Sequence, residues 1–298
     1  MNDFFKKIPI VAPTPTPFTN DEVDYEKLSN NIEKWHNTSI SGFVLGSHGG
    51  EEFHLSNDEK RQIIDTVVET NNKKRVIIAG IETPSPKVAL NLINDYALRG
   101  VDFVRIRIPA TFRKGSMYSE GVVNYFENIL RDSPLPVIVI HQPRTSLDPD
   151  ISPEELSVIS EIDGIVAYII SLNFRWETVI PKIISKKIHL WTCNGSLLFP
   201  GASIGATGAC LFFGNWAPDK CREIIKLTLD GNFEKAISLQ KNLISADYIG
   251  MSRGVGALKY GLNLLGYDAT VPRLPTKPLN TDDKELLKSA FKDALILD

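Results

Sequence analysis

The chain has 298 residues, of which 43% are hydrophobic and 23% charged, as is typical of a folded globular protein. Its formal net charge is −3, and its lysines and arginines are scattered, so the sequence shows no nucleic-acid footprint and indicates a small-molecule partner. The start of the chain lacks the apolar run of a signal peptide, and no later run is long enough to span a membrane, so we expect a cytoplasmic protein without a membrane partner.

The cysteines and histidines indicate neither a disulfide framework nor a metal centre. The three cysteines are an odd number without C-x-x-C spacing, so we expect reduced thiols. Metal binding by His48, His54 and His141 is conceivable, but no spacing typical of metal ligands supports it. We therefore predict no metal and no other cofactor.

Short apolar, β-branched runs alternate with amphipathic runs along most of the chain, which indicates βα units and a parallel sheet. The predicted strands, in chain order, are Ile8–Ala12, Gly42–Leu45, Arg75–Ala79, Phe103–Ile108, Val137–His141, Ile165–Ile169, His189–Thr192 and Ala209–Phe213.

Capping signals mark several helix starts, because Ser56 with Glu59 and Ser152 with Glu155 have the spacing of capping boxes. The helices predicted after the strands are Asp24–Asn37, Ser56–Asn71, Ser85–Arg99, Ser119–Arg131, Ser152–Ile162, Phe174–Ile184, Ser196–Ile204 and Pro218–Leu229. Eight strands, each followed by a helix, are the count of a (β/α)₈ TIM barrel, and the chain has a suitable length.

After this repeat only helices are predicted, at Phe233–Ile249, Gly254–Leu265 and Asp282–Leu295. The sequence thus predicts an α/β barrel over residues 1–230 and a C-terminal helical extension over 231–298 packed on it. Active groups of such barrels come from the carboxyl ends of the strands and the loops after them, so the site is expected there.

The second predicted strand ends in the glycine-rich stretch Gly46–Glu52. Backbone amides of such a turn, with the Ser47 hydroxyl beside them, can hold a carboxylate or phosphate. The alternative is a tight turn that needs glycine only for its positive φ. The position at the barrel rim leaves the two interpretations evenly matched.

The fourth predicted strand carries Arg105 and Arg107 on one face, because side chains alternate along a strand. They would face the lumen only if a buried anion or an acidic partner compensated them. We therefore expect them to face outward and to form salt bridges between the barrel and its helices.

The fifth and sixth strands end in candidate acid–base groups. His141 can act as a general base because its ordinary pKa lies near neutrality, or it can be a hydrogen-bonded structural residue. Tyr168, expected to face the lumen, can donate a hydrogen bond or act as a weak acid, or it can simply fill the core.

Several stretches along the whole chain match a known family in its order: Pro13–Phe18, Gly46–Gly49, Glu52–Ser56, Ile77–Gly80, Leu135–Ile138, Gly205–Gly208, Gly231–Ala236, Ala257–Tyr260 and Arg273–Pro275. By these stretches the chain resembles the dihydrodipicolinate synthase and N-acetylneuraminate lyase family, with details closest to its 4-hydroxy-2-oxoglutarate aldolase-like branch.

The resemblance implies a homotetrameric or homodimeric barrel that binds a small 2-oxo acid or another carboxylate. Family members hold the 2-oxo acid as an imine on a strand-six lysine, and a tyrosine in a Tyr-Asn-x-Pro stretch of strand five moves protons. The turn after strand two holds the carboxylate. Carried over residue by residue, the resemblance implies these substrate-binding positions: Gly46, Ser47, His48, Gly49, Thr111, Ile140 and Gly208.

The chain departs from the family at the positions that carry the chemistry. Ile140 stands where the family has its strand-five tyrosine, and the family spacing from there to the lysine ends at Tyr168. Shifting this frame by one or two residues also reaches no amine: Val166, Ala167, Ile169 or Ile170. Without an amine no iminium electron sink can form, so ordinary aldolase turnover is not expected.

Three hypotheses follow. The first is a family member without Schiff-base chemistry that serves as a binding or regulatory protein. The second is an active carbon–carbon or carbon–oxygen lyase that uses Tyr168, His141 and His48 as catalytic acid–base groups, or a relocated lysine such as Lys114. The third is a pocket that has lost every role, with rim residues that serve only in packing.

Overall fold

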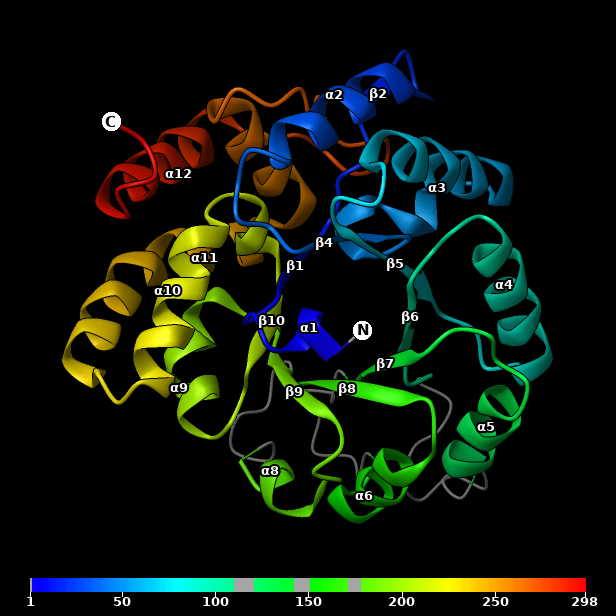
Figure 1. Ribbon diagram of the computed structural model, residues 1–298. Coiled ribbons are helices and arrows are strands. Elements are labelled where there is room, and N and C mark those ends of the chain that lie inside the picture. Colours follow the sequence, from blue (N-terminus) through cyan, green and yellow to red (C-terminus); the bar gives the residue numbers. More distant parts are fainter. Residues whose placement is uncertain (1, 110–120, 142–150, 171–177) are drawn as a thin grey trace.

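The computed structural model describes residues 2–109, 121–141, 151–170 and 178–298. Eight parallel strands form a closed barrel in the order β1-β10-β9-β8-β7-β6-β5-β4, with helices around it (Figure 1). The strands are β1 Ile10–Pro13, β4 Gly42–Leu45, β5 Val76–Ile81, β6 Phe103–Arg107, β7 Val137–Ile140, β8 Ile165–Ile170, β9 His189–Thr192 and β10 Gly208–Cys210. The predicted (β/α)₈ barrel is therefore confirmed.

The helices lie close to their predicted positions, and both predicted capping boxes are present. The α-helices between the strands are α2 Tyr25–Trp35, α3 Asn57–Asn71, α4 Pro86–Leu98, α5 Gly121–Leu130, α6 Pro153–Glu161, α8 Ile180–Ile183, α9 Leu198–Ser203 and α10 Pro218–Leu229. Short 3₁₀-helices are η1 His48–Gly50, η2 Glu52–His54, η3 Gly195–Leu197 and η4 Phe212–Asn215. The first part of the predicted helix Phe174–Ile184 lies outside the described residues.

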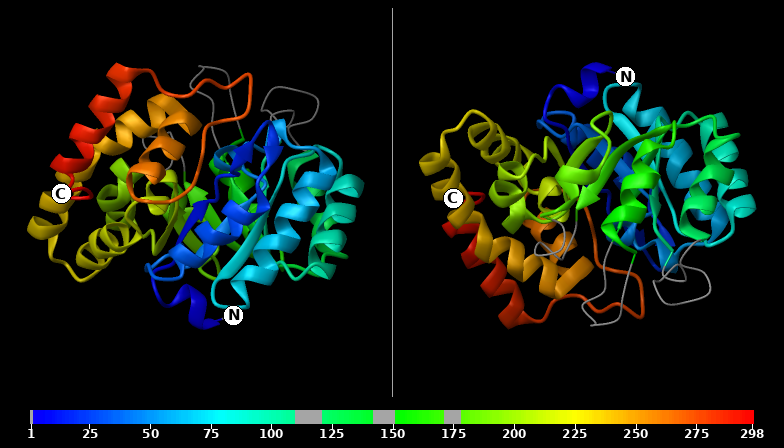
Figure 2. Two further views of the ribbon diagram at one scale, coloured as in Figure 1. Left: turned by 90° about the horizontal axis from the view of Figure 1, so that it is seen from above. Right: turned by 90° about the horizontal axis from the view of Figure 1, so that it is seen from below.

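The C-terminal part of the chain contains α11 (Phe233–Leu264) and α12 (Thr281–Asp293), which pack beside α10 on one side of the barrel (Figure 2). At Gly254 the backbone of α11 leaves the helical conformation, with φ 60° and ψ −141°, so α11 consists of two helical segments. This break agrees with the two separate helices that the sequence predicts. No helix among the described residues is long and apolar enough to cross a lipid bilayer.

Two elements were not expected from the sequence. The strands β2 (Phe18–Thr19) and β3 (Glu22–Val23) form a small antiparallel hairpin. The short helix α1 (Asn2–Phe5) lies across the barrel axis in Figure 1. The ring of Phe5 stacks on His189 at 4.3 Å and lies edge-on to Phe103 at 5.8 Å. Since these are residues of β9 and β6, α1 packs against the amino end of the lumen.

The buried apolar side chains form two separate groups, which shows where each strand residue points. The larger group fills the layer between the barrel and its helices. The smaller group, the lumen core, contains Phe5, Val11, Val44, Ile78, Phe103, Ile138, Ile140, Ala167, Ile169, Trp191 and Cys210. Because successive side chains of a strand alternate between these two layers, the lumen core identifies the inward positions of each strand.

Candidate functional site

A cavity of about 260 Å³ lies at the carboxyl end of the barrel, above the lumen core. Its described lining comes from the ends of β1, β4, β6, β7, β9 and β10 and from α11: Pro13, Ser47, His48, Gly49, Arg105, Arg107, Ile140, Cys193, Cys210, Leu211, Phe212 and Met251. This is the end of a TIM barrel at which ligands bind, and the volume suits a small molecule rather than a polymer.

The turn after β4 supplies one wall of the cavity. Gly46 has a positive φ of 59°, and the chain then enters η1, in which the amide of Gly50 donates to the carbonyl of Ser47 at 2.8 Å. The Ser47 hydroxyl is buried and donates to the carbonyl of Val44 at 3.4 Å. The His48 ring lies nearly parallel to the Phe212 ring, with centroids 6.0 Å apart. These hydrogen bonds and the ring contact hold the turn in one conformation at the cavity wall.

Gly80 of β5 allows the Gly46 turn to approach, because a Cβ at position 80 would lie 1.9 Å from the Gly46 carbonyl oxygen. Since the atoms that this Cβ would meet are backbone, Gly80→Ala must displace either the turn or the strand. We expect this substitution to lower the free energy of unfolding by about 2 kcal/mol or more, measured by urea unfolding. Gly214→Ala is the matched control, because its Cβ would meet only side-chain atoms, the nearest at 3.2 Å. Equal losses for the two variants would contradict this explanation.

Arg105 and Arg107 lie in the cavity, so the expectation that they face outward is wrong. Both share the inward face of β6 with Phe103, which belongs to the lumen core. Arg107 donates to Glu82 at 3.2 Å and forms an ion pair with the same carboxylate at 3.0 Å. Glu52 lies 4.0 Å from Arg107. The acidic partners that an inward arginine requires are thus present for Arg107, on the segments that follow β5 and β4.

Tyr168 does not face the lumen, so that expectation is also wrong. Ala167 and Ile169 belong to the lumen core, whereas Tyr168 belongs to the layer between barrel and helices. Its hydroxyl lies 3.4 Å from Nδ1 of His141, which is 2% exposed and also does not line the cavity. Catalytic roles for Tyr168 and His141 stay predictions, and the pair lies outside the cavity wall.

The other predicted site residues divide into three groups. Ser47, His48, Gly49 and Ile140 line the cavity, as the predicted binding roles require. Gly46 and Gly208 do not line it. Thr111 and Lys114 lie outside the described residues.

Sequence reasoning missed two cysteines of the cavity wall, Cys193 and Cys210. Burial raises the pKa of Cys210 to about 11, although the nearby Arg105 guanidinium acts in the opposite direction. Cys210 is therefore a neutral thiol at physiological pH. Cys193 lies two residues after the lumen residue Trp191, so strand alternation carried one step beyond β9 would have placed it here.

No lysine is found among the described residues that line the cavity. The helix α11, which contributes Met251 to the cavity wall, also carries the buried Lys259. Lys259 does not line the cavity and forms an ion pair with Glu51 at 2.6 Å. Its ammonium also donates to the carbonyl of Val271 at 2.9 Å. This amine is thus engaged in linking the C-terminal helices to the loop after β4.

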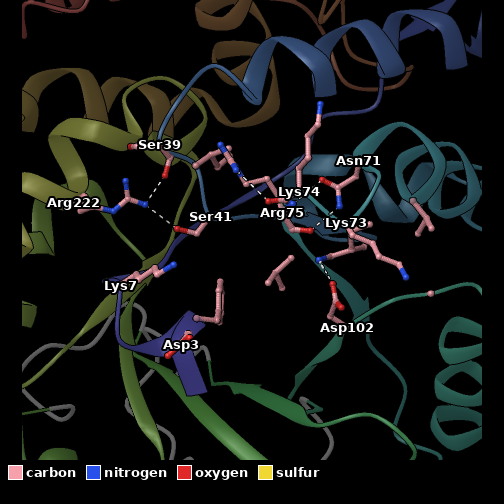
Figure 3. A pocket seen from close by; sticks show the side chains of 16 residues that line it. Asp3, Lys7, Ser39, Ser41, Asn71, Lys73, Lys74, Arg75, Asp102 and Arg222 are labelled. Carbon is pink, nitrogen blue, oxygen red and sulfur yellow. Dashed lines mark hydrogen bonds between the residues drawn. The ribbon is translucent and has the colours of Figure 1, made fainter. Parts of the chain in front are cut away.

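A larger cavity of about 780 Å³ lies at the opposite end of the barrel, where the strands begin (Figure 3). The two arginines that line it form hydrogen bonds with backbone carbonyls. Arg75 donates to the carbonyls of His36 and Thr38 at 3.1 and 3.2 Å, and Arg222 donates to the carbonyl of Ile8 at 3.2 Å. Residues at this end of a TIM barrel generally serve stability. We therefore take the smaller cavity at the carboxyl end as the candidate site.

The fold is a TIM barrel with a cavity of small-molecule size at the carboxyl ends of its strands. The model of the dihydrodipicolinate synthetase family matches residues 6–294, so the chain belongs to this family. It is 28% identical over 282 residues to a 4-hydroxy-tetrahydrodipicolinate synthase of Acetivibrio thermocellus, covering 93% of this chain and 94% of that protein.

A further relative and a solved structure are also similar to this chain. An Emericella nidulans protein named "Probable 4-hydroxy-2-oxoglutarate aldolase, mitochondrial" is 24% identical over 300 residues, covering 97% of this chain and 95% of that protein. The crystal structure of dihydrodipicolinate synthase from Cyanidioschyzon merolae with lysine bound matches with a TM-score of 0.88 at 22% identity, covering 99% of both chains. The second likeness shows the fold alone. The family resemblance predicted from the sequence is confirmed.

Proposed function

We propose that the cavity at the carboxyl end of the barrel binds a small 2-oxo acid or a related carboxylate without forming a Schiff base. The protein then acts as a binding or regulatory member of its family. One observation carries the proposal: the described lining offers guanidinium groups, from Arg105 and Arg107, and no primary amine.

The different chemistry of a lysine amine and an arginine guanidinium supports binding without a Schiff base. A lysine amine that loses its proton in a desolvated site attacks a ketone and forms an imine. A guanidinium keeps its proton throughout the physiological range and is not a nucleophile, but its planar donors suit a carboxylate. Such a lining can hold and orient an anion, yet it cannot supply the electron sink of an aldolase. Each 1.36 kcal/mol of lost transition-state stabilisation is about a tenfold loss of rate.

Isothermal titration calorimetry with pyruvate, followed by borohydride reduction and intact-mass measurement, tests the proposal. We expect saturable binding of pyruvate, no binding of the neutral analogue pyruvamide, and an unchanged protein mass. Rapid retro-aldol turnover of a 4-hydroxy-2-oxo acid, or a reduced pyruvate adduct on the wild-type chain, would show that the proposal is wrong.

A second candidate function is an active lyase on a 2-oxo acid. It is favoured by the presence of His48 in the cavity wall, where an imidazole can act as a general base. In its lysine version Lys114 forms the imine, and the borohydride adduct disappears in Lys114→Met. In its acid–base version, turnover without any adduct is abolished by Tyr168→Phe or His48→Gln.

Three further statements stay predictions from the sequence. They are a homotetrameric or homodimeric assembly, a cytoplasmic location, and a boundary between a barrel at 1–230 and an extension at 231–298. Light scattering of the purified chain tests the first of them. We expect a mass of two or four chains, and a monomer at all concentrations would contradict this.

A further inference from the structure

Within the part of the chain that the structure describes, Arg105 is a buried cation with no ion-pair partner. Its side chain is carried by the middle of β6, between Gly80 of β5 and Ile138 of β7, and the residue is 6% exposed. Its Nε is buried without a hydrogen-bond partner. Among the described residues, no ion pair or side-chain hydrogen bond includes Arg105. A buried charge that is neither paired nor hydrogen-bonded is costly, so the unliganded barrel carries a destabilising group at its centre.

The neighbouring Arg107, in contrast, has ion-pair partners. It lies two residues closer to the mouth on the same strand face and forms ion pairs with Glu82 at 3.0 Å and Glu52 at 4.0 Å. These two carboxylates, which do not belong to the described cavity lining, therefore compensate Arg107 directly, and neither forms an ion pair with Arg105. The thiol of Cys210 cannot replace them as a counter-ion, because burial raises its pKa to about 11.

The remaining walls around these groups are largely apolar. Ile140, Leu211, Phe212 and Met251 line the cavity together with the β4 turn. Such walls favour an uncharged body on the ligand. A second anionic group would have to approach the carboxylates that accompany Arg107, and like charges repel one another in a desolvated site.

We propose that Arg105 is the anion receptor of the cavity, and that it binds the carboxylate of a small monocarboxylate whose remaining atoms are uncharged. The inference rests on the proposed function, because it names the class of ligand for the same cavity. A guanidinium–carboxylate pair would give the buried Nε of Arg105 the acceptor that it lacks among the described residues and would neutralise the charge. The cost of the unpaired charge is then offset when the ligand is bound.

The test uses the full chain and four proteins: wild type, Arg105→Met, Arg105→Lys and the control Arg131→Met. Arg131 is an exposed arginine after α5, so its replacement makes the same change in net charge away from the cavity. Thermal unfolding without ligand comes first. We expect a higher midpoint for Arg105→Met than for wild type, because an uncompensated buried charge is removed, and an unchanged midpoint for the control.

Binding of pyruvate by calorimetry comes second. We expect at least about 30-fold weaker binding by Arg105→Met, because truncating one partner of a buried charge pair removes most of its contribution. We expect Arg105→Lys to recover part of the affinity and Arg131→Met to match wild type. Pyruvate should also bind more tightly than the dicarboxylate 2-oxoglutarate.

The outcomes separate this inference from the proposed function. Equal pyruvate affinity of wild type and Arg105→Met overturns the role of Arg105 and leaves the proposed function standing. Tighter binding of 2-oxoglutarate overturns the monocarboxylate assignment. A borohydride adduct on the wild type, together with an Arg105-dependent affinity, overturns the proposed function and supports the receptor. If Arg105→Met fails to fold, the pyruvate affinity of Arg105→Lys decides the role of Arg105, and an affinity equal to that of the wild type overturns it. If the folded wild type binds no carboxylate, both the role of Arg105 and the proposed function are overturned.

Discussion

Ile169→Lys is expected to give this barrel the covalent capture of pyruvate that we do not expect of the wild type. Ile169 is fully buried, belongs to the lumen core, and lies beside Ile140 of β7 in register. A lysine here would extend toward the cavity that Ile140 lines. Burial should lower the pKa of its ammonium, so that a neutral, nucleophilic amine is available near neutral pH.

Borohydride reduction in the presence of pyruvate, followed by peptide mass mapping, measures this gain. We expect a reduced adduct on residue 169 of Ile169→Lys and none on the wild type. Tyr168→Lys is the matched control, because residue 168 lies in the layer between barrel and helices and should place its amine outside the cavity. An adduct on Tyr168→Lys but not on Ile169→Lys would show that the inward positions of β8 are assigned incorrectly.

Lys259→Met is expected to lower the free energy of unfolding by about 3–5 kcal/mol, because it removes the buried ammonium from Glu51 and leaves only His54, at 3.6 Å, beside that carboxylate. Lys259 is fully buried, its Nζ lies 2.6 Å from Glu51, and the amide of Arg273 donates to the same carboxylate at 2.9 Å. Glu51→Gln should have a comparable effect through the unpaired ammonium. The double variant should lose less than the sum of the two single losses, as measured by urea unfolding.

The pH dependence of this pair has a definite sign. Burial lowers the pKa of Lys259 to about 8, while the attraction of Glu51 acts in the opposite direction. Because the folded chain then binds this proton less tightly than the unfolded chain, the free energy of unfolding should rise as pH increases from about 8 toward 10.5. We expect this rise in the wild type and not in Lys259→Met. The same slope in both proteins would contradict the assignment.

The barrel could be predicted because its strands and helices each carry a local signal. Apolar β-branched runs mark the strands, and serine caps such as Ser56 and Ser152 mark the helices. The helix α1 could not be found in this way, because four residues are too short to show a helical period. This helix is held in place by contacts of Phe4 and Phe5 with residues of β6 and β9, which are distant in the sequence.

The directions of the site residues could be predicted only in part. Alternation shows that Arg105 and Arg107 share a face, but it does not show which face is inward, and the compensating Glu82 and Glu52 come from other loops. Tyr168 was expected in the lumen because the family spacing counted from Ile140 ends there. In the structure Ile140 pairs with Ile169, one residue further, and the pairing of β7 with β8 shifts its register between Val137 and Ile138. A sequence alone shows neither this pairing nor this shift.

The aromatic contacts of α1 have a consequence for the traffic of small molecules. Phe4 and Phe5 pack against Phe103 and Trp191, and the cavities at the two ends of the barrel share no described lining residue. Among the described residues the two cavities are therefore separate, and no channel joins the two ends of the barrel. A ligand of the carboxyl-end cavity would enter and leave at that end, so one molecule would have to depart before the next could bind.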